Sequence, residues 1–213
     1  MLALTLLAGA TCLAPACSSP STEPSTEAPP ETGTTVSQYD LRNGMRALWI
    51  DHVTWTRVFL IDAIAGLADT PQATQRLLQN QADIGNAVKP FYGNAAGDQL
   101  ATLLHDHITG AAALVTAAAG GDAAKIATAK TAWYANADQI AMFLAAANPN
   151  WALADLKTHM HTHLDQTLAE ATARLTADWA GDVTAYDAVV AHILVMADVL
   201  SDGIAKQMPE RVE

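Results

Sequence analysis

Residues 41–67 read LRNGMRALWIDHVTWTRVFLIDAIAGL, and their apolar side chains recur at spacings of three and four residues. This spacing places them on one face of an α-helix, because the helix turns once every 3.6 residues. His52 lies near the middle of that face. The other members of the face are Leu41, Met45, Leu48, Phe59 and Ala63. The stretch therefore predicts a long amphipathic helix with an imidazole on its core side.

The chain beyond residue 67 continues the same pattern. Cap residues, glycines and prolines separate further predicted helices over residues 71–89, 94–120, 122–148, 151–177 and 182–206. No stretch alternates apolar and polar residues with a period of two, so no strand is expected. Short connections make neighbouring helices antiparallel. The sequence therefore predicts an all-α domain, an up-and-down bundle of about six helices arranged as three helical hairpins.

The composition is that of one globular domain, and its charge argues against nucleic acid as a partner. The 213 residues are 51% hydrophobic and include 22 acidic against 11 basic residues, for a formal net charge of −11. The apolar share excludes a fully disordered protein, while 12 glycines and 2 cysteines exclude a collagen and a disulfide scaffold. An acidic surface without a Lys/Arg run repels phosphates, so nucleic acid is not an expected partner.

The first 37 residues differ in composition from the helical region. Residues 1–16, MLALTLLAGATCLAPA, are uncharged and end in small residues, which predicts a secretory signal peptide. Residues 17–37 form a Ser-, Thr-, Pro- and Glu-rich linker that is expected to be disordered. This division leaves residues 38–213 for the helical bundle.

Cys17 stands where a bacterial lipoprotein carries its acylated cysteine. If Cys17 is acylated, the domain is anchored on the extracytoplasmic side of the membrane, in the cell envelope. If an ordinary signal peptidase cleaves after Ala16 instead, the protein is secreted in soluble form. Cys12 and Cys17 are the only cysteines, so the predicted bundle has no thiol for a disulfide, a thiolate metal site or a nucleophile.

Three histidines recur at nearly equal intervals. His52, His107 and His163 are 55 and 56 residues apart, and each precedes a branched apolar residue. Each lies about 11 or 12 residues into its predicted helix, which is roughly 16–18 Å at 1.5 Å per residue. The three helices that carry them should run in the same direction. The interval therefore predicts an internal repeat whose three imidazoles lie at one level.

Three neutral imidazoles form a ligand set that zinc, copper or iron accepts, with one coordination position left for water or a carboxylate. The candidates for such a carboxylate are Asp187, at the edge of the apolar face of residues 182–206, and Glu170, beyond His163. The alternative is that each imidazole is a core residue that bonds to a neighbouring helix or to water, because an unpartnered buried polar ring is costly.

Two functions follow from these alternatives. The first is an exported, lipid-anchored helical bundle that binds a transition metal through buried histidines, with hydrolysis or redox chemistry open to it. The second is a non-catalytic cell-envelope module that binds a protein or a small apolar molecule between its helices. Whether the protein is an enzyme stays open, because the sequence has no Gly-x-Ser-x-Gly and no His-Glu-x-x-His motif.

Several short motifs are distinctive. They are LWxxHVxWTR at residues 48–57, KPFYG at 89–93, WYxNAD at 133–138, MAD at 196–198 and GIxKQ at 203–207. Over residues 40–209 the chain resembles a family of small bacterial all-helical proteins, some of which carry export signals. The resemblance implies an autonomous bacterial domain. It carries no catalytic or binding role that could be transferred to a residue of this chain.

Overall fold

The computed structural model describes residues 35–213, so the predicted signal peptide, Cys17 and most of the predicted linker lie outside the described residues. Within this range the chain forms five helices and no strand, which confirms the all-α prediction. The helices are α1 (Gln38–Ala65), α2 (Thr70–Ala119), α3 (Ala123–Ala147), α4 (Leu153–Leu175) and α5 (Trp179–Gln207).

Side-chain caps begin three of the helices. In each case a Ser or Asp oxygen accepts a hydrogen bond from the backbone N–H three residues later, which satisfies one of the free donors at a helix start. The caps are Ser37 to Asp40 N (3.0 Å), Asp122 to Lys125 N (3.1 Å) and Asp178 to Gly181 N (3.0 Å). These three polar residues therefore stabilise the starts of α1, α3 and α5.

The second helix differs from the predicted pair over residues 71–89 and 94–120. It continues past Pro90 and departs from helical geometry only at Gly93, where φ is 82° and ψ is 166°. A positive φ of this size favours glycine, since a side chain would be strained there. Pro90 lies within one turn of the break, so its missing N–H disturbs a helical segment that is already ending.

The chain reverses direction at Gly93. A Cβ atom added to Gly85 would lie 2.6 Å from the carbonyl oxygen of Gly97, so the two backbones touch. In a straight helix, residues this far apart along the chain would be separated by about 18 Å. The second helix therefore has two arms, residues 70–92 and 94–119, that pack against each other at their glycines.

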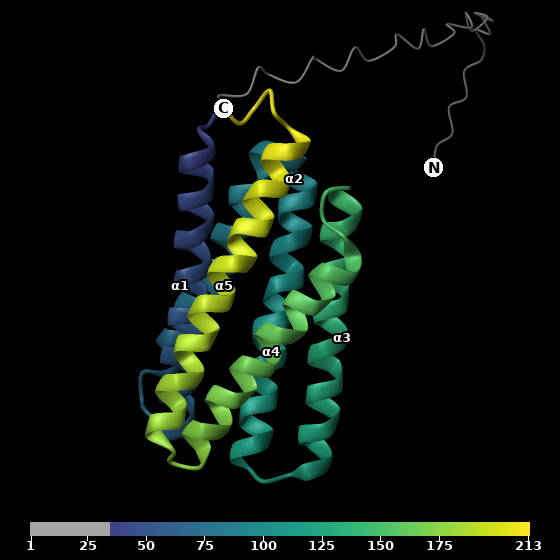
Figure 1. Ribbon diagram of the computed structural model, residues 1–213. Coiled ribbons are helices and arrows are strands. Elements are labelled where there is room, and N and C mark those ends of the chain that lie inside the picture. The colour runs from purple at the N-terminus through teal and green to yellow at the C-terminus, as the bar shows by residue number, and fades with distance from the viewer. Residues whose placement is uncertain (1–34) are drawn as a thin grey trace, which may run out of the picture. The chain divides into compact units, whose positions relative to one another are not determined.

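The helices pack around a shared core (Figure 1). α1 contacts α2 and α5, α3 contacts α2 and α4, and α4 contacts α5 while crossing the bundle obliquely. The main apolar cluster includes Trp49, Ile84, Leu104, Ile140, Leu164 and Ile193. A smaller cluster lies farther along α1 and α4 and comprises Phe59, Leu60, Leu77, Ile108, Val115 and Ala171. His52 and His163 lie at the border between the two clusters.

The C-terminal residues join the start of the bundle. Val36 N donates to Arg211 O at 3.0 Å, and Glu213 N donates to Val36 O at 3.1 Å. By length and composition α5 could cross a membrane, but it buries Val189, Ile193 and Ile204 in the core. Its apolar character is therefore explained by packing within the bundle.

Candidate functional site

The structure brings His52, His107 and His163 together from α1, the second arm of α2 and α4. The ring centroids of His52 and His163 are 5.9 Å apart, and those of His107 and His163 are 6.2 Å apart. Each of the three residues is only 3% exposed. Trp49 packs edge-on against His52, and Trp133 packs against His107 with its ring centroid 5.4 Å away. The imidazoles therefore lie inside the bundle with aromatic side chains around them.

A polar side chain from the following helical segment contacts the turn that precedes each of the three histidines. In every case it binds the backbone carbonyl of the residue four positions before the histidine. The contacts are Asn80 Nδ2 to Leu48 O (2.9 Å), Asn136 Nδ2 to Leu103 O (3.1 Å) and His192 Nε2 to His159 O (2.9 Å). The three side chains follow their histidines by 28 or 29 residues. This regular interval is visible in the sequence and could have identified the side chains that bind the turn before each histidine. It was not used to predict them.

The bonds of Asn136 fix the tautomer of His107. Because the Asn136 amide nitrogen donates to Leu103, the amide oxygen is the atom 2.9 Å from His107 Nδ1, and it accepts. His107 Nδ1 therefore carries the proton, and the neutral ring has its lone pair on Nε2. Asn80 has the matching place beside His52, yet His52 Nδ1 and Asn80 Oδ1 both lack a hydrogen-bond partner. The corresponding atoms of the other pair, His107 Nδ1 and Asn136 Oδ1, are hydrogen-bonded.

Burial keeps all three imidazoles uncharged. Burial lowers the pKa of His52 to about 4. Burial and the neighbouring His52 lower the pKa of His107 to about 4, although the bond to Asn136 acts in the opposite direction. The pKa of His163 is well below its usual value because of burial and the two other imidazoles. Near pH 7 the site therefore presents three neutral rings, each with one unprotonated nitrogen.

Some polar atoms of the site have no partner. His52 Nδ1, His163 Nδ1 and Trp133 Nε1 are buried without a hydrogen bond. A buried unsatisfied polar group costs about 1–3 kcal/mol. The site therefore has unused hydrogen-bonding capacity at three neighbouring rings.

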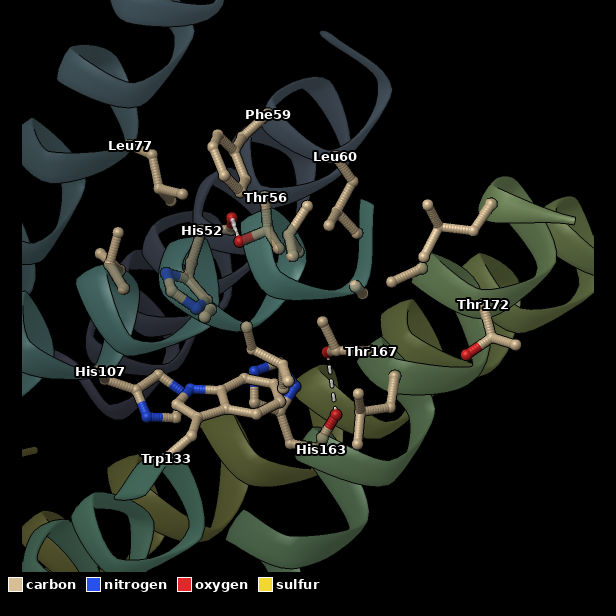
Figure 2. Close-up of a pocket in the computed structure, with 18 of the residues that line it drawn as sticks. His52, Thr56, Phe59, Leu60, Leu77, His107, Trp133, His163, Thr167 and Thr172 are labelled. Atoms are coloured by element: carbon tan, nitrogen blue, oxygen red, sulfur yellow. Dashed lines mark hydrogen bonds between the residues drawn. The ribbon is translucent and has the colours of Figure 1, made fainter. Parts of the chain in front are cut away.

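A cavity of about 250 Å³ adjoins the histidines. In Figure 2 the rings of His107, Trp133 and His163 lie together on one side, and Phe59, Leu60 and Leu77 lie on the other. The lining residues come from α1, both arms of α2, α3 and α4. Thr56 and Thr167 also line it, and their hydroxyls donate to the carbonyls of His52 and His163. The cavity is thus apolar except around the imidazoles and the threonines.

Neither of the two predicted auxiliary carboxylates lies beside the imidazoles. Asp187 is exposed on α5, a helix that contributes no residue to the cavity. Glu170 is buried, but it accepts a hydrogen bond from Arg57 Nη1 at 2.7 Å. Arg57 also binds both oxygens of the buried Asp182, which accepts a further bond from Arg174. The position of Glu170 therefore reflects charge neutralisation by arginine, a partner that helix periodicity alone did not reveal.

In residues 35–213 no three His, Cys, Asp or Glu side chains are already arranged to hold one metal ion. The imidazoles are close neighbours, but their nitrogens do not converge on a single point. Comparisons with protein-family models, curated proteins and solved structures found no match for the chain.

Proposed function

We propose that the protein binds one transition-metal ion through His52, His107 and His163. The observation that supports the proposal is the proximity of three neutral, buried imidazoles, which come from three different helical segments and line one cavity. Imidazole nitrogen is a preferred ligand of zinc, copper and iron. Metal-bound histidines usually donate their other ring N–H to an oxygen acceptor, as His107 does to Asn136.

Binding requires a small movement of the rings. A tetrahedral ion about 2.0–2.1 Å from each nitrogen holds imidazole centroids about 5 Å apart. The centroid distances here are 5.9 and 6.2 Å. The adjoining cavity gives the rings room to turn. A turn of His52 that pairs its Nδ1 with Asn80 Oδ1 would satisfy both orphaned atoms and would reproduce the arrangement of His107 with Asn136.

The proposal includes a finer description of the fold. Taking the two arms of α2 as separate helices gives six helical segments in an up-and-down bundle of three hairpins. The support is the reversal at Gly93 and the repeated carbonyl contacts of Asn80, Asn136 and His192. In this description α1, the second arm of α2 and α4 run in one direction, so each repeat supplies one imidazole at the same height.

We also propose that the bundle works outside the cytoplasm. The support is the sequence alone: the signal-like residues 1–16, Cys17 at a lipidation position and the Pro-rich linker. Acylated Cys17 would tether the bundle to the membrane surface. Nucleic acid is not an expected partner, because the chain is acidic. The reaction, if the bound ion supports one, is left open between hydrolysis and redox chemistry.

A second candidate function is a non-catalytic envelope module in which the histidines only pack the core. The observation that favours it is the absence, in the described residues, of three donors already arranged around one point. The two proposals differ in what a histidine substitution does. A ligand substitution removes metal affinity, whereas a packing substitution changes only the stability of the fold.

The experiment compares His107→Gln with His105→Gln in a Co²⁺ titration of the chelator-treated protein. His107 and His105 lie on the same helix, but His105 is exposed. We expect Co²⁺ to bind the unchanged protein with a visible absorption band, and His107→Gln to bind at least tenfold more weakly. His105→Gln should bind like the unchanged protein. Equal affinity of all three proteins for Co²⁺, or no uptake by any, would contradict metal binding at the histidines.

A further inference from the structure

The cavity beside the histidines is larger than one metal ion needs. Its volume is about 250 Å³, and an apolar cavity of about 150 Å³ is enough to accept benzene. Most of its wall is hydrocarbon, including Phe59, Leu60, Leu77, Leu114 and Val115. Among the described residues, no Asp, Glu, Lys or Arg lines it. Its volume and lining therefore suit a small uncharged molecule.

The polar atoms of the wall are concentrated at the imidazole side. His52 Nδ1, His163 Nδ1 and Trp133 Nε1 are buried without partners, on side chains that are 3% exposed. His163 packs against His52, and His107 packs against both His163 and Trp133. A hydroxyl group suits these atoms, because it can donate to an unprotonated imidazole nitrogen and accept from a ring N–H.

The cavity also reaches the surface. Thr172 and Leu175, near the end of α4, are exposed and line it. Ala118, at the end of α2, and Ile126, near the start of α3, are half-buried and line it as well. A small molecule therefore has a route between these three helix ends.

We infer that this cavity binds a small uncharged molecule of about ten non-hydrogen atoms, a phenol or alcohol with a hydrocarbon body. Its hydrocarbon part lies among the apolar side chains, and its hydroxyl lies against the imidazoles. An ionised molecule is excluded because burying a charge without a partner is costly. The inference goes beyond metal binding and does not depend on it, because it rests on the volume and the lining of the cavity.

The test uses 1-naphthol as the probe and the chelator-treated full chain as the protein. Calorimetric titration should show one 1-naphthol per chain, and the melting temperature should rise because the ligand binds the folded state. Ionised 1-naphthoate should bind at least tenfold more weakly. No binding of 1-naphthol up to its solubility, or equal affinity for 1-naphthoate, would overturn the inference.

A matched pair of variants places the probe in the cavity. Ala111 lines the cavity, and Ala113 is exposed two residues later on the same helix. We expect Ala111→Phe to weaken 1-naphthol binding at least tenfold and Ala113→Phe to leave it unchanged. Wild-type affinity in a folded Ala111→Phe protein would contradict the placement.

A second measurement covers the case in which Ala111→Phe does not fold. Nuclear Overhauser contacts from 1-naphthol to the methyl groups of Leu77 and Leu114 in the unchanged protein should be observed. Contacts only to exposed methyl groups would refute the cavity site. The outcomes also separate the two proposals: Co²⁺ uptake without 1-naphthol binding removes only this inference, and the reverse result removes only metal binding.

Discussion

His52, His107 and His163 owe their protonation state to burial more than to any charged neighbour. Within residues 35–213 no carboxylate accepts from their rings, and His107 Nδ1 donates its hydrogen bond to the neutral amide oxygen of Asn136. A protonated imidazole would therefore be poorly compensated there. This single-residue property makes the rings suitable both as metal ligands and as hydrogen-bond partners for an uncharged molecule.

A pH dependence of stability follows for the metal-free protein. The folded state holds His52 and His107 neutral down to about pH 4, whereas an unfolded histidine takes up a proton near pH 6.5. The unfolded state thus binds more protons between these values, so the free energy of unfolding falls as the pH falls from 6.5 to 4. The loss amounts to at most about 3 kcal/mol for each histidine.

Urea unfolding between pH 7 and 4.5, in chelator, measures this loss, with His107→Gln as the comparison. Glu170 acts in the opposite direction, because burial raises its pKa to about 7 and the folded state gains a proton as the pH falls. Because His107→Gln removes one of the histidines that the fold holds neutral, the variant should lose less stability on acidification than the unchanged protein. Identical pH profiles of the two proteins would show that His107 is not held neutral by burial.

For single residues, the sequence predicted that the three histidines lie close together, and their role as metal ligands stays a prediction. The interval between the three histidines is visible in the sequence, and the structure brings these residues together. The carboxylates were harder to place, because helix periodicity does not show which charge lies opposite. Arg57 holds Glu170 across the bundle, a contact between residues far apart in the chain. The cavity could not be predicted at all, since it depends on how four helices pack.

For the helices, α2 shows how far proline and glycine positions in a sequence predict a helix break. Pro90 and Gly93 marked a break, and the break falls at Gly93 alone because its backbone adopts a positive φ. The close approach of the two arms depends on Gly85 and Gly97, which have no side chains to separate the backbones. The sequence does not predict this contact, because the residue that lies opposite each glycine is known only once the chain has reversed direction at Gly93.

Gly85→Ala tests the contact between the arms. The new Cβ would lie 2.6 Å from Gly97 O, so the arms must separate, and we expect a loss of about 1–3 kcal/mol in the free energy of unfolding. Gly44→Ala is the control, because nothing lies within 4 Å of its Cβ position in α1. It should stabilise the protein by about 0.5–1 kcal/mol, as expected for alanine in a helix. Chemical denaturation measures both, and an equal or higher stability of Gly85→Ala would contradict the packing.

For the molecule as a whole, three helical segments each bring one imidazole to the same buried centre. The all-α class could be predicted because periodicity, caps and turns agree along the chain. The site arises from the arrangement of the segments, as each contributes one imidazole and one side chain that binds the preceding turn.

The most direct test of metal binding is the metal content of the full chain, purified without a histidine tag. Mass spectrometry measures it before and after dialysis against a chelator. We predict about one zinc, copper or iron ion per chain, which is lost on chelation and is regained, with a rise in melting temperature, when the ion is added. A protein that contains no metal and takes up none of the three ions with measurable stabilisation would contradict it, and the histidines would then be core residues.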